Sequence, residues 1–341
     1  MKREKKNRLR KLLKVSGISL LYGLGLLLLI WEFGALWYDC PGPVGVKRAV
    51  ALLFLLAVPL LVFLKKRAFR IVALGLMLAV MGWWWTLKPS HDRPWQTDVA
   101  KLAWAEISGD EVTLHNVRNF DYRTETDYTP RWETRKVKIS QITGIDLAVT
   151  YWGSRYMAHP ILSFQFAEGP PVCFSIETRK EVGESYSAIG GFFRQFELIY
   201  IVADERDVIR LRTNYRKGEE VYLYRLSSSP EKARMRFMEY LIALNALKDR
   251  PRWYNAATSN CTTAIRTQRA IKDRTRWDWR YLVNGWADEM LYERGSLVKS
   301  GLEFKTLKAL SRINPDAKSA DQSPDFSEKI RRNLPLFQTK D

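Results

Sequence analysis

The sequence predicts a membrane-anchored α+β protein, and three features of the chain lead to that prediction. The first 87 residues hold almost all of the strongly apolar sequence, in three segments of helical length. From about residue 100, short segments alternate apolar and polar residues, as strands with one buried face do. Between residues 227 and 251, "SSSPEKARMRFMEYLIALNALKDRP" combines helix start and stop signals with an apolar face at helical spacing.

The three apolar segments are residues 15–37, 49–64 and 71–87. A helix that crosses a bilayer needs roughly 20 apolar residues, with about 17 at the short end. The first segment meets this length, while the second and third fit best as a tight helical hairpin. The alternative is one long anchor followed by two helices that are buried in a protein core.

Charge placement favours three spans and sets their direction. The basic stretches "MKREKKNRLRKLLK" and "KKRAFR" are expected on the cytoplasmic side, and "GWWWTLKPS" resembles an aromatic belt at the outer surface. We therefore expect a multi-pass protein of the bacterial cytoplasmic membrane. Its expected parts are a cytoplasmic N-terminus (1–14), a membrane region (15–87), an extracytoplasmic domain (88–311) and a loosely ordered polar tail (312–341).

The net charge of the chain is mainly a signal of membrane topology. Residues 1–88 carry +12 of the formal net charge of +18, which leaves +6 for the other 253 residues. A nucleic-acid-binding protein would need a clustered basic face, so nucleic acid is not an expected partner. The chain has no Gly-rich phosphate loop and no His/Cys spacing typical of a metal site, and we expect no cofactor.

The outer domain is expected to contain at least six strands and two helices. The second helix is predicted from Cys261 to about Lys272. The segment "ERDVIRLRTNYR" (205–216) carries several arginines, which would either bind an anionic head group or form an ion-paired face. The predicted strands are "EVTLHNV", "RKVKISQI", "HPILSFQF", "VCFSIET", "QFELIYIVA" and "EVYLYRL".

Cys261 is the candidate nucleophile. It follows Ser259 and Asn260, either of which can cap a helix that begins at the cysteine. A cysteine in the first turn of a helix has a lowered thiol pKa, and nearby backbone amides can stabilise an oxyanion. The alternatives are a small buried core residue or a disulfide with Cys173.

His159 is the preferred general base among the three histidines. His91 lies just beyond the membrane segments, and His115 lies on the polar face of a strand, whereas His159 begins the core strand "HPILSFQF". Across the predicted hairpin, either Ser175 or Glu177 can approach its imidazole, and a carboxylate is the better partner for an imidazolium. A structural role for His159, or a surface ion pair for Glu177, is the competing interpretation.

Several long motifs of this domain resemble the Lnb-type periplasmic domain family, and the resemblance extends from about residue 100 to residue 330. They are "NVRNFDYRTETDYTPRWETR", "HPILSFQF", "FSIETRKEVGESYSAIGGFFRQFELIYIVADERDVIRLRTNYR", "RWYNAATSNCTT" and "NGWADEMLYERG". The resemblance implies a lipoprotein N-acyltransferase, which moves an acyl chain from the diacylglyceryl group of a lipoprotein to its N-terminal amine. The order of His159 before Cys261 is also similar to a circularly permuted papain-like (NlpC-type) fold, with an antiparallel sheet and a helix that carries the cysteine.

These resemblances imply a nucleophilic Cys261 and a basic His159, with Glu177 as the inferred third member and Asn260 as support for the oxyanion. The expected substrate is a membrane lipid or lipoprotein, and the acyl group is expected to pass through a thioester on Cys261. Two alternatives stay open: a membrane-anchored cysteine hydrolase that acts on peptide, peptidoglycan or lipid ester, and a non-catalytic envelope scaffold.

Overall fold

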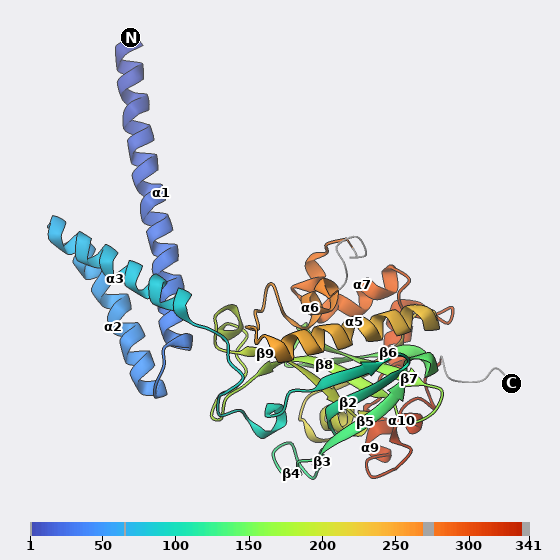
Figure 1. Cartoon of the computed structure of the whole chain (residues 1–341). Coiled ribbons are helices and arrows are strands. Elements are labelled where there is room, and N and C mark those ends of the chain that lie inside the picture. Colours follow the sequence, from blue (N-terminus) through green and yellow to red (C-terminus); the bar gives the residue numbers. More distant parts are fainter. Residues whose placement is uncertain (1, 65, 269–275, 336–341) are drawn as a thin grey trace. The chain divides into compact units, whose positions relative to one another are not determined.

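The structure is a computed structural model that describes residues 2–64, 66–268 and 276–335, with only the backbone described at 2–6, 8–12, 261 and 267 (Figure 1). The chain divides into two compact units. One contains residues 1–89 together with 187–195, and the other contains residues 90–186 and 196–341.

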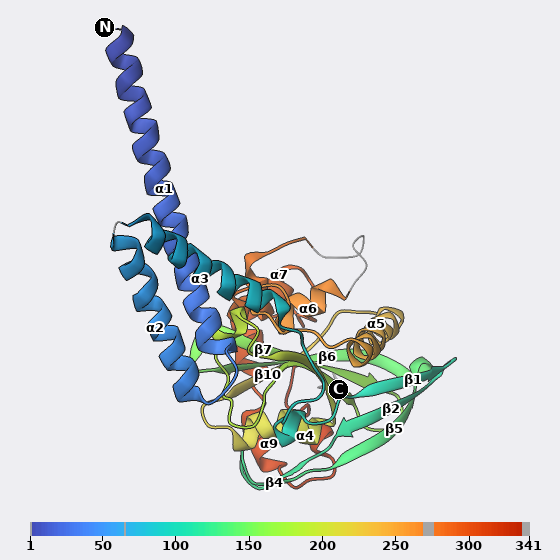
Figure 2. The same ribbon diagram turned by 60° about the vertical axis from the view of Figure 1, so that its left-hand side comes forward.

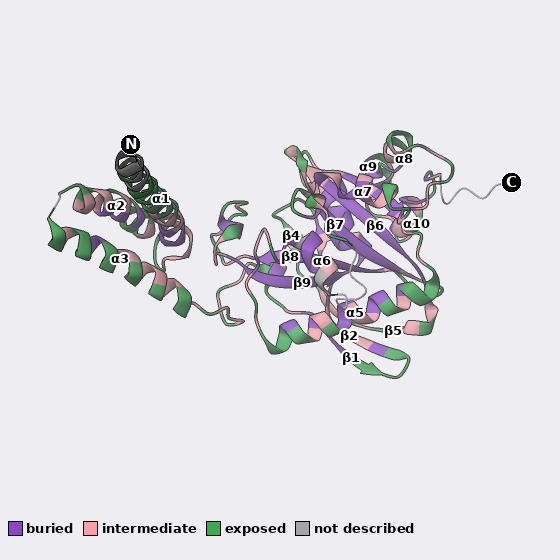
Figure 3. Cartoon of the chain, turned by 90° about the horizontal axis from the view of Figure 1, so that it is seen from above, coloured by how far each residue is buried: buried purple, intermediate pink, exposed green. Residues whose placement is uncertain are grey.

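The first unit is built from three apolar helices, α1 (Lys2–Asp39), α2 (Val44–Phe63) and α3 (Arg67–Thr86). All three are long and apolar enough to cross a membrane. The predicted segments end within two residues of the helix ends, but each helix begins before its predicted start, at residues 2, 44 and 67 rather than 15, 49 and 71. Exposed leucines, isoleucines and valines cover their outer surfaces (Figure 3). A surface of this kind suits a lipid environment rather than water.

Residues 187–195 pack against this helical unit. The backbone amide of Arg194 donates to the Asp39 carboxylate at 3.1 Å, and the ring of Phe193 stacks on Tyr38 with 5.3 Å between centroids. The Phe193 ring also lies where a Cβ atom on Gly34 would be, 2.1 Å away. Gly34 is therefore needed for this close approach.

The second unit is an α+β domain around a sheet of eight described strands in the order β1-β2-β9-β8-β7-β6-β10, with β5 paired to β2. Neighbouring strands are antiparallel, except that β2 meets β9 through one parallel pair, Arg118↔Ala203. A small hairpin of β3 and β4 lies apart. The strands are β1 (Trp104–Ser108), β2 (Glu111–Arg118), β3 (Asp121–Tyr122), β4 (Tyr128–Thr129), β5 (Trp132–Lys138), β6 (Ile142–Trp152), β7 (Ser154–Phe166), β8 (Val172–Arg179), β9 (Glu197–Ala203) and β10 (Glu220–Arg225).

Helices cover both faces of this sheet (Figure 2). On the first face, α5 (Pro230–Asp249) and α6 (Cys261–Thr267) pack over Leu162, Phe164 and Phe174. On the second face, α4 (Glu205–Arg210), α9 (Asn314–Ser319) and α10 (Phe326–Lys329) pack over Ile161 and Cys173. Adjacent residues of β7 thus belong to different cores, as the alternation of the sequence predicts.

The helix α5 confirms the clearest helical prediction. Ser229 caps it, since its side chain accepts from the Lys232 amide, and Pro230 occupies the first helical position. Phe237, Tyr240 and Leu241 are fully buried against the sheet. The remaining described elements are short: η1 (Thr97–Val99), η2 (Ile139–Gln141), η3 (Gly190–Phe192), the π-helical η4 (Leu211–Tyr215), η6 (Trp279–Tyr281), η7 (Asn284–Trp286), α7 (Ala287–Glu293) and α8 (Phe304–Leu310).

The segment after Arg312 differs from the loosely ordered tail that its polar composition predicts. Ile313, Ala317, Phe326 and Ile330 have no exposed surface and form part of the core on the second face. Their helices, α9 and α10, are only 6 and 4 residues long. Elements this short show no clear apolar period, which is why composition alone suggests a tail.

Candidate active site

Cys261 is the first residue of α6, as predicted. The Asn260 side chain caps the helix: its Oδ1 accepts from the amides of Thr262 at 2.9 Å and Thr263 at 2.7 Å. In return, the Asn260 amide donates to the Thr263 hydroxyl at 2.9 Å, which completes a capping box. This cap fixes the backbone position of Cys261. The Cys261 side chain, and the predicted continuation of the helix over 269–272, lie outside the described residues.

Asn260 is expected to support the oxyanion, and in the structure its side chain forms the cap of the helix that carries Cys261. Its Nδ2 donates to the carbonyls of Ala256 at 2.7 Å and Tyr281 at 3.4 Å. The side chain is 4% exposed, and all its polar atoms have protein partners. Asn260 is therefore a positioning residue for α6, and the amides of Thr262 and Thr263 are also engaged in the cap.

His159, Ser175 and Glu177 form one hydrogen-bonded chain across the β7–β8 hairpin. The His159 Nε2 lies 2.6 Å from Ser175 Oγ, and Ser175 Oγ lies 2.7 Å from Glu177 Oε1. Because an ionised carboxylate only accepts, Ser175 donates to Glu177 and receives the Nε2 proton of His159. This assignment leaves Nδ1 of His159 as the basic ring nitrogen. Ser175 and Glu177, which the sequence analysis gives as alternative partners of His159, are therefore linked to it one after the other by hydrogen bonds.

Arg212, from η4, completes this cluster and was not predicted as a site residue. It donates to Glu177 Oε1 at 3.2 Å and also pairs with Glu219. Burial lowers the pKa of His159 to about 3, and the nearby charge of Arg212 acts in the same direction. Burial would raise the pKa of Glu177, but Arg212 and His159 hold that pKa well below its usual range. The imidazole is therefore neutral and the carboxylate ionised at neutral pH.

The imidazole of His159 lies on the second face of the sheet, whereas α6 packs on the first face. His159 shares its face with Ile161, and α6 buries Ala264 among the residues of the first core. Within the regular part of the sheet, the strands would separate Cys261 from His159. The His159 imidazole and α6 therefore do not lie on the same face of the sheet.

The sheet opens, however, at the place where His159 lies. The pairs between β7 and β8 stop at Ile161↔Ser175, although both strands continue beyond that point. At this place Asn284 joins β7 to α6: its Oδ1 accepts from the Ala158 amide at 2.8 Å, and its Nδ2 donates to the Thr262 hydroxyl at 3.3 Å. Through this one side chain, the residue before His159 is linked to the residue after Cys261.

The comparison with known families decides what kind of domain carries this cluster. Residues 128–285 match the family model of the Lnb N-terminal periplasmic domain. This match confirms the resemblance seen in the motifs, and it includes His159, Glu177, Asn260 and Cys261. No curated protein and no solved structure matches the chain. The three apolar helices and the periplasmic family together indicate an inner-membrane protein with a periplasmic domain.

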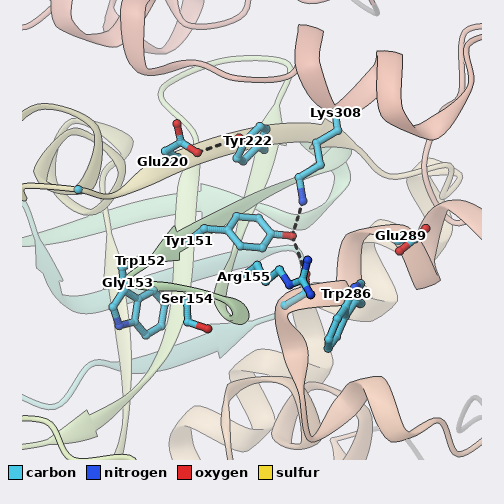
Figure 4. A pocket seen from close by; sticks show the side chains of 12 residues that line it. Tyr151, Trp152, Gly153, Ser154, Arg155, Glu220, Tyr222, Trp286, Glu289 and Lys308 are labelled. Atoms are coloured by element: carbon cyan, nitrogen blue, oxygen red, sulfur yellow. Dashed lines mark hydrogen bonds between the residues drawn. The ribbon is translucent and has the colours of Figure 1, made fainter.

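A pocket of about 580 Å³ lies beside Asn284 (Figure 4). Its wall includes Gly285 and Trp286, which directly follow Asn284, together with the first residues of β7. Lys308 donates to the Tyr151 hydroxyl at 2.8 Å, and that hydroxyl donates to the Gly285 carbonyl at 3.1 Å. These contacts hold η7 in place, and η7 in turn carries the bridging Asn284.

The other candidate residues of the sheet domain have structural positions. His91 Nε2 contacts the Leu247 carbonyl at 3.0 Å, and His115 stacks on Trp104. Cys173 is a free thiol with no exposed surface, so it forms no bridge with Cys261. Three of the four arginines of 205–216 are ion-paired: Arg210 with Asp121, Arg212 with Glu177 and Glu219, and Arg216 with Glu125 and Glu219.

His159→Gln is expected to make the stability of the protein less sensitive to acid. The depressed pKa of His159 in the fold means that the unfolded chain binds a proton more readily between pH 6.5 and about 3. The contribution of His159 is complete above pH 6.5 and is lost as the pH falls, by about 2 kcal/mol at pH 5. Melting temperatures of both proteins in detergent should therefore converge from pH 7 to pH 4.5. A constant difference over this range would show that His159 does not titrate this way.

Proposed function

We propose that this protein is a membrane-anchored, thiol-dependent acyltransferase that acts on lipoprotein or lipid acyl chains at the outer face of the inner membrane. The observation that carries the proposal is the side chain of Asn284, which joins the residue after Cys261 to the residue before His159. Asn260 caps the helix that begins at Cys261. The chain of His159, Ser175 and Glu177 occupies Nε2 of the ring and leaves Nδ1 as the basic nitrogen.

In the proposed reaction, Nδ1 of His159 accepts the thiol proton of Cys261 as the sulfur attacks an ester carbonyl of the lipid. The C–O bond then breaks, the leaving alcohol takes the proton from the imidazolium, and an acyl-thioester remains. An amine attacks the thioester, gives its proton to His159, and the C–S bond breaks to release the amide and the thiolate. The thiolate recovers its proton from the imidazolium.

The surroundings of His159 act on this role in two directions. The ring is neutral and can accept a proton, and the Glu177 carboxylate, acting through Ser175, favours the imidazolium, whereas burial and the charge of Arg212 oppose it. Arg212 holds Glu177 ionised. Among the described residues, no hydrogen bond to Nδ1 of His159 competes with the thiol.

Two further parts of the proposal concern architecture. The order of a histidine strand before a cysteine helix, with α6 in contact with both β7 and β8, supports a permuted papain-like (NlpC-type) arrangement. Three apolar helices, each of spanning length, support a multi-pass anchor that places the domain next to its lipid substrate.

The proposal is tested by product analysis with the full chain in phospholipid nanodiscs and a diacylglyceryl-cysteine lipopeptide. We expect mass spectrometry to show an N-acylated lyso-lipopeptide. Free fatty acid without N-acylation would instead identify a hydrolase, and a cleaved peptide would identify a peptidase. No product of any kind would favour the non-catalytic scaffold.

A further inference from the structure

The Lnb domain exposes a group of large apolar side chains next to the Cys261 site, which we call the aromatic patch. The rings of Trp279 and Tyr156 both contact Trp286, with centroids 5.3 and 5.2 Å from the centroid of its ring. Trp277 and Trp279 are each 56% exposed. Tryptophan has the largest apolar side chain, and it is rarely so exposed on a surface that faces water. The patch consists of Tyr156, Trp277, Trp279, Leu282, Val283 and Trp286.

The patch lies at one particular end of the central sheet. Tyr156 is near the start of β7, and the antiparallel register places the start of β7 beside the end of β8 and the start of β9. The bridging residue Asn284, and through it the start of α6, are attached at this same end.

The chain also enters and leaves the sheet domain at this end. Ser90, the first residue of the domain, donates from its amide to Glu197, the first residue of β9. Residues 187–195 belong to the helical unit, so the chain leaves the sheet domain after Tyr186 and enters it again at Phe196. The rings of Tyr186 and Phe196 stack with 6.3 Å between their centroids. All three crossings between the two units therefore begin or end beside the start of β9.

The length of the chain limits how far this end can be from the membrane. Four peptide links join Thr86, the last residue of α3, to Ser90, and they span at most about 14 Å. This limit applies to any arrangement of the two units. The end of the sheet that carries the aromatic patch thus stays within reach of the lipid surface.

The composition of the patch fits the interfacial layer of a bilayer. Tryptophan and tyrosine side chains favour this layer, in which one end of the ring is apolar and the other is wet. Arg155 lies over the Tyr156 ring, with its Cζ 5.1 Å from the centroid. Arg155 and Arg276 are exposed, and neither forms a salt bridge within the described part of the chain. Such arginines complement anionic phospholipids.

We propose that the aromatic patch docks into the interfacial layer of the phospholipid bilayer that holds the helical anchor. Docking would turn the opening between β7 and β8 towards the acyl chains, because the patch and the opening share one end of the sheet. This surface is inferred from exposure and chain connections alone, so it does not depend on the chemistry proposed for Cys261.

Photocrosslinking in nanodiscs of phosphatidylethanolamine and phosphatidylglycerol tests the proposal. The photoreactive amino acid p-benzoylphenylalanine replaces Val283 in the patch or, as a matched control, Met235. Met235 is 64% exposed and follows Arg234, which donates to the Ser140 carbonyl at the opposite end of the sheet. Mass spectrometry of the irradiated full chain should show lipid adducts at least about fivefold more often at position 283.

A second change separates docking from mere exposure. Trp279→Ser, combined with the probe at 283, should lower the lipid adducts at least about threefold with an unchanged melting temperature. Equal lipid labelling at 235 and 283 would overturn the proposal, and so would crosslinks from 283 mainly to a second copy of the chain. The same measurements in a Cys261→Ala background should be unaffected, so a failure of the acyl chemistry can be told apart from a failure of docking.

Discussion

Cys261→Ala is expected to abolish formation of the N-acylated lipopeptide, with turnover at least about 10³-fold below that of the unchanged protein. In the proposed reaction the thioester forms on this sulfur, and among the described residues at the start of α6 no other group is placed to replace it. Asn260 is occupied as the helix cap, and Thr262 and Thr263 are buried hydroxyls in the same turn. Product yield from the full chain in nanodiscs measures the effect.

Cys40→Ala is the matched control for this experiment. Cys40 follows the last residue of α1 and is only half-buried, so its removal tests for general effects of losing a thiol. Its turnover should stay within about twofold of the unchanged protein. Turnover by Cys261→Ala above about a tenth of the unchanged value would exclude a covalent role for this cysteine.

Arg331→Met is expected to lower the stability of the periplasmic domain by about 3–5 kcal/mol. The Arg331 guanidinium donates to Asp146 at 2.9 Å and to both oxygens of Glu205, at 2.8 and 2.5 Å. Both carboxylates have no exposed surface. Methionine preserves the apolar stem of the side chain but leaves the buried negative charges without this partner. The melting temperature in detergent should fall by roughly 6–20 °C.

The neighbouring Arg332 provides the control for this prediction. It is exposed, so Arg332→Met should change the melting temperature by less than about 2 °C. Combining Arg331→Met with Glu205→Gln should recover part of the loss, because the second change removes one of the buried charges. Equal effects of the two arginine changes would show that the segment after residue 312 is not part of the folded core.

Local patterns in the sequence predict the elements of this protein well. Ser229 and Pro230 fix the start of α5, and Asn260 fixes the start of α6, since caps act within a few residues. The period of two along the β7–β8 hairpin also places His159, Ser175 and Glu177 on one face. Each of these features depends on residues that are close in the chain or joined by one tight turn.

These local patterns do not predict contacts between segments that are distant in the chain. Periodicity does not say which helix covers which face, so it could not show that α6 and the His159 ring lie on opposite sides of the sheet. Arg212 and Asn284 lie 35 and 22 residues from their partners Glu177 and Thr262. Both belong to motifs noted in the sequence, but only the fold gives them their partners. The buried Arg331 was missed for the same reason.

Peptide mapping of the acyl-enzyme is the most direct test of a covalent Cys261. The full chain in nanodiscs is supplied with the lipid ester donor but no amine acceptor, then digested and analysed by mass spectrometry. The account predicts one acyl chain on the peptide that contains Cys261, released by hydroxylamine and absent from the Cys40 peptide. An unmodified Cys261 peptide, in a preparation that makes N-acylated product once the amine is added, would contradict it.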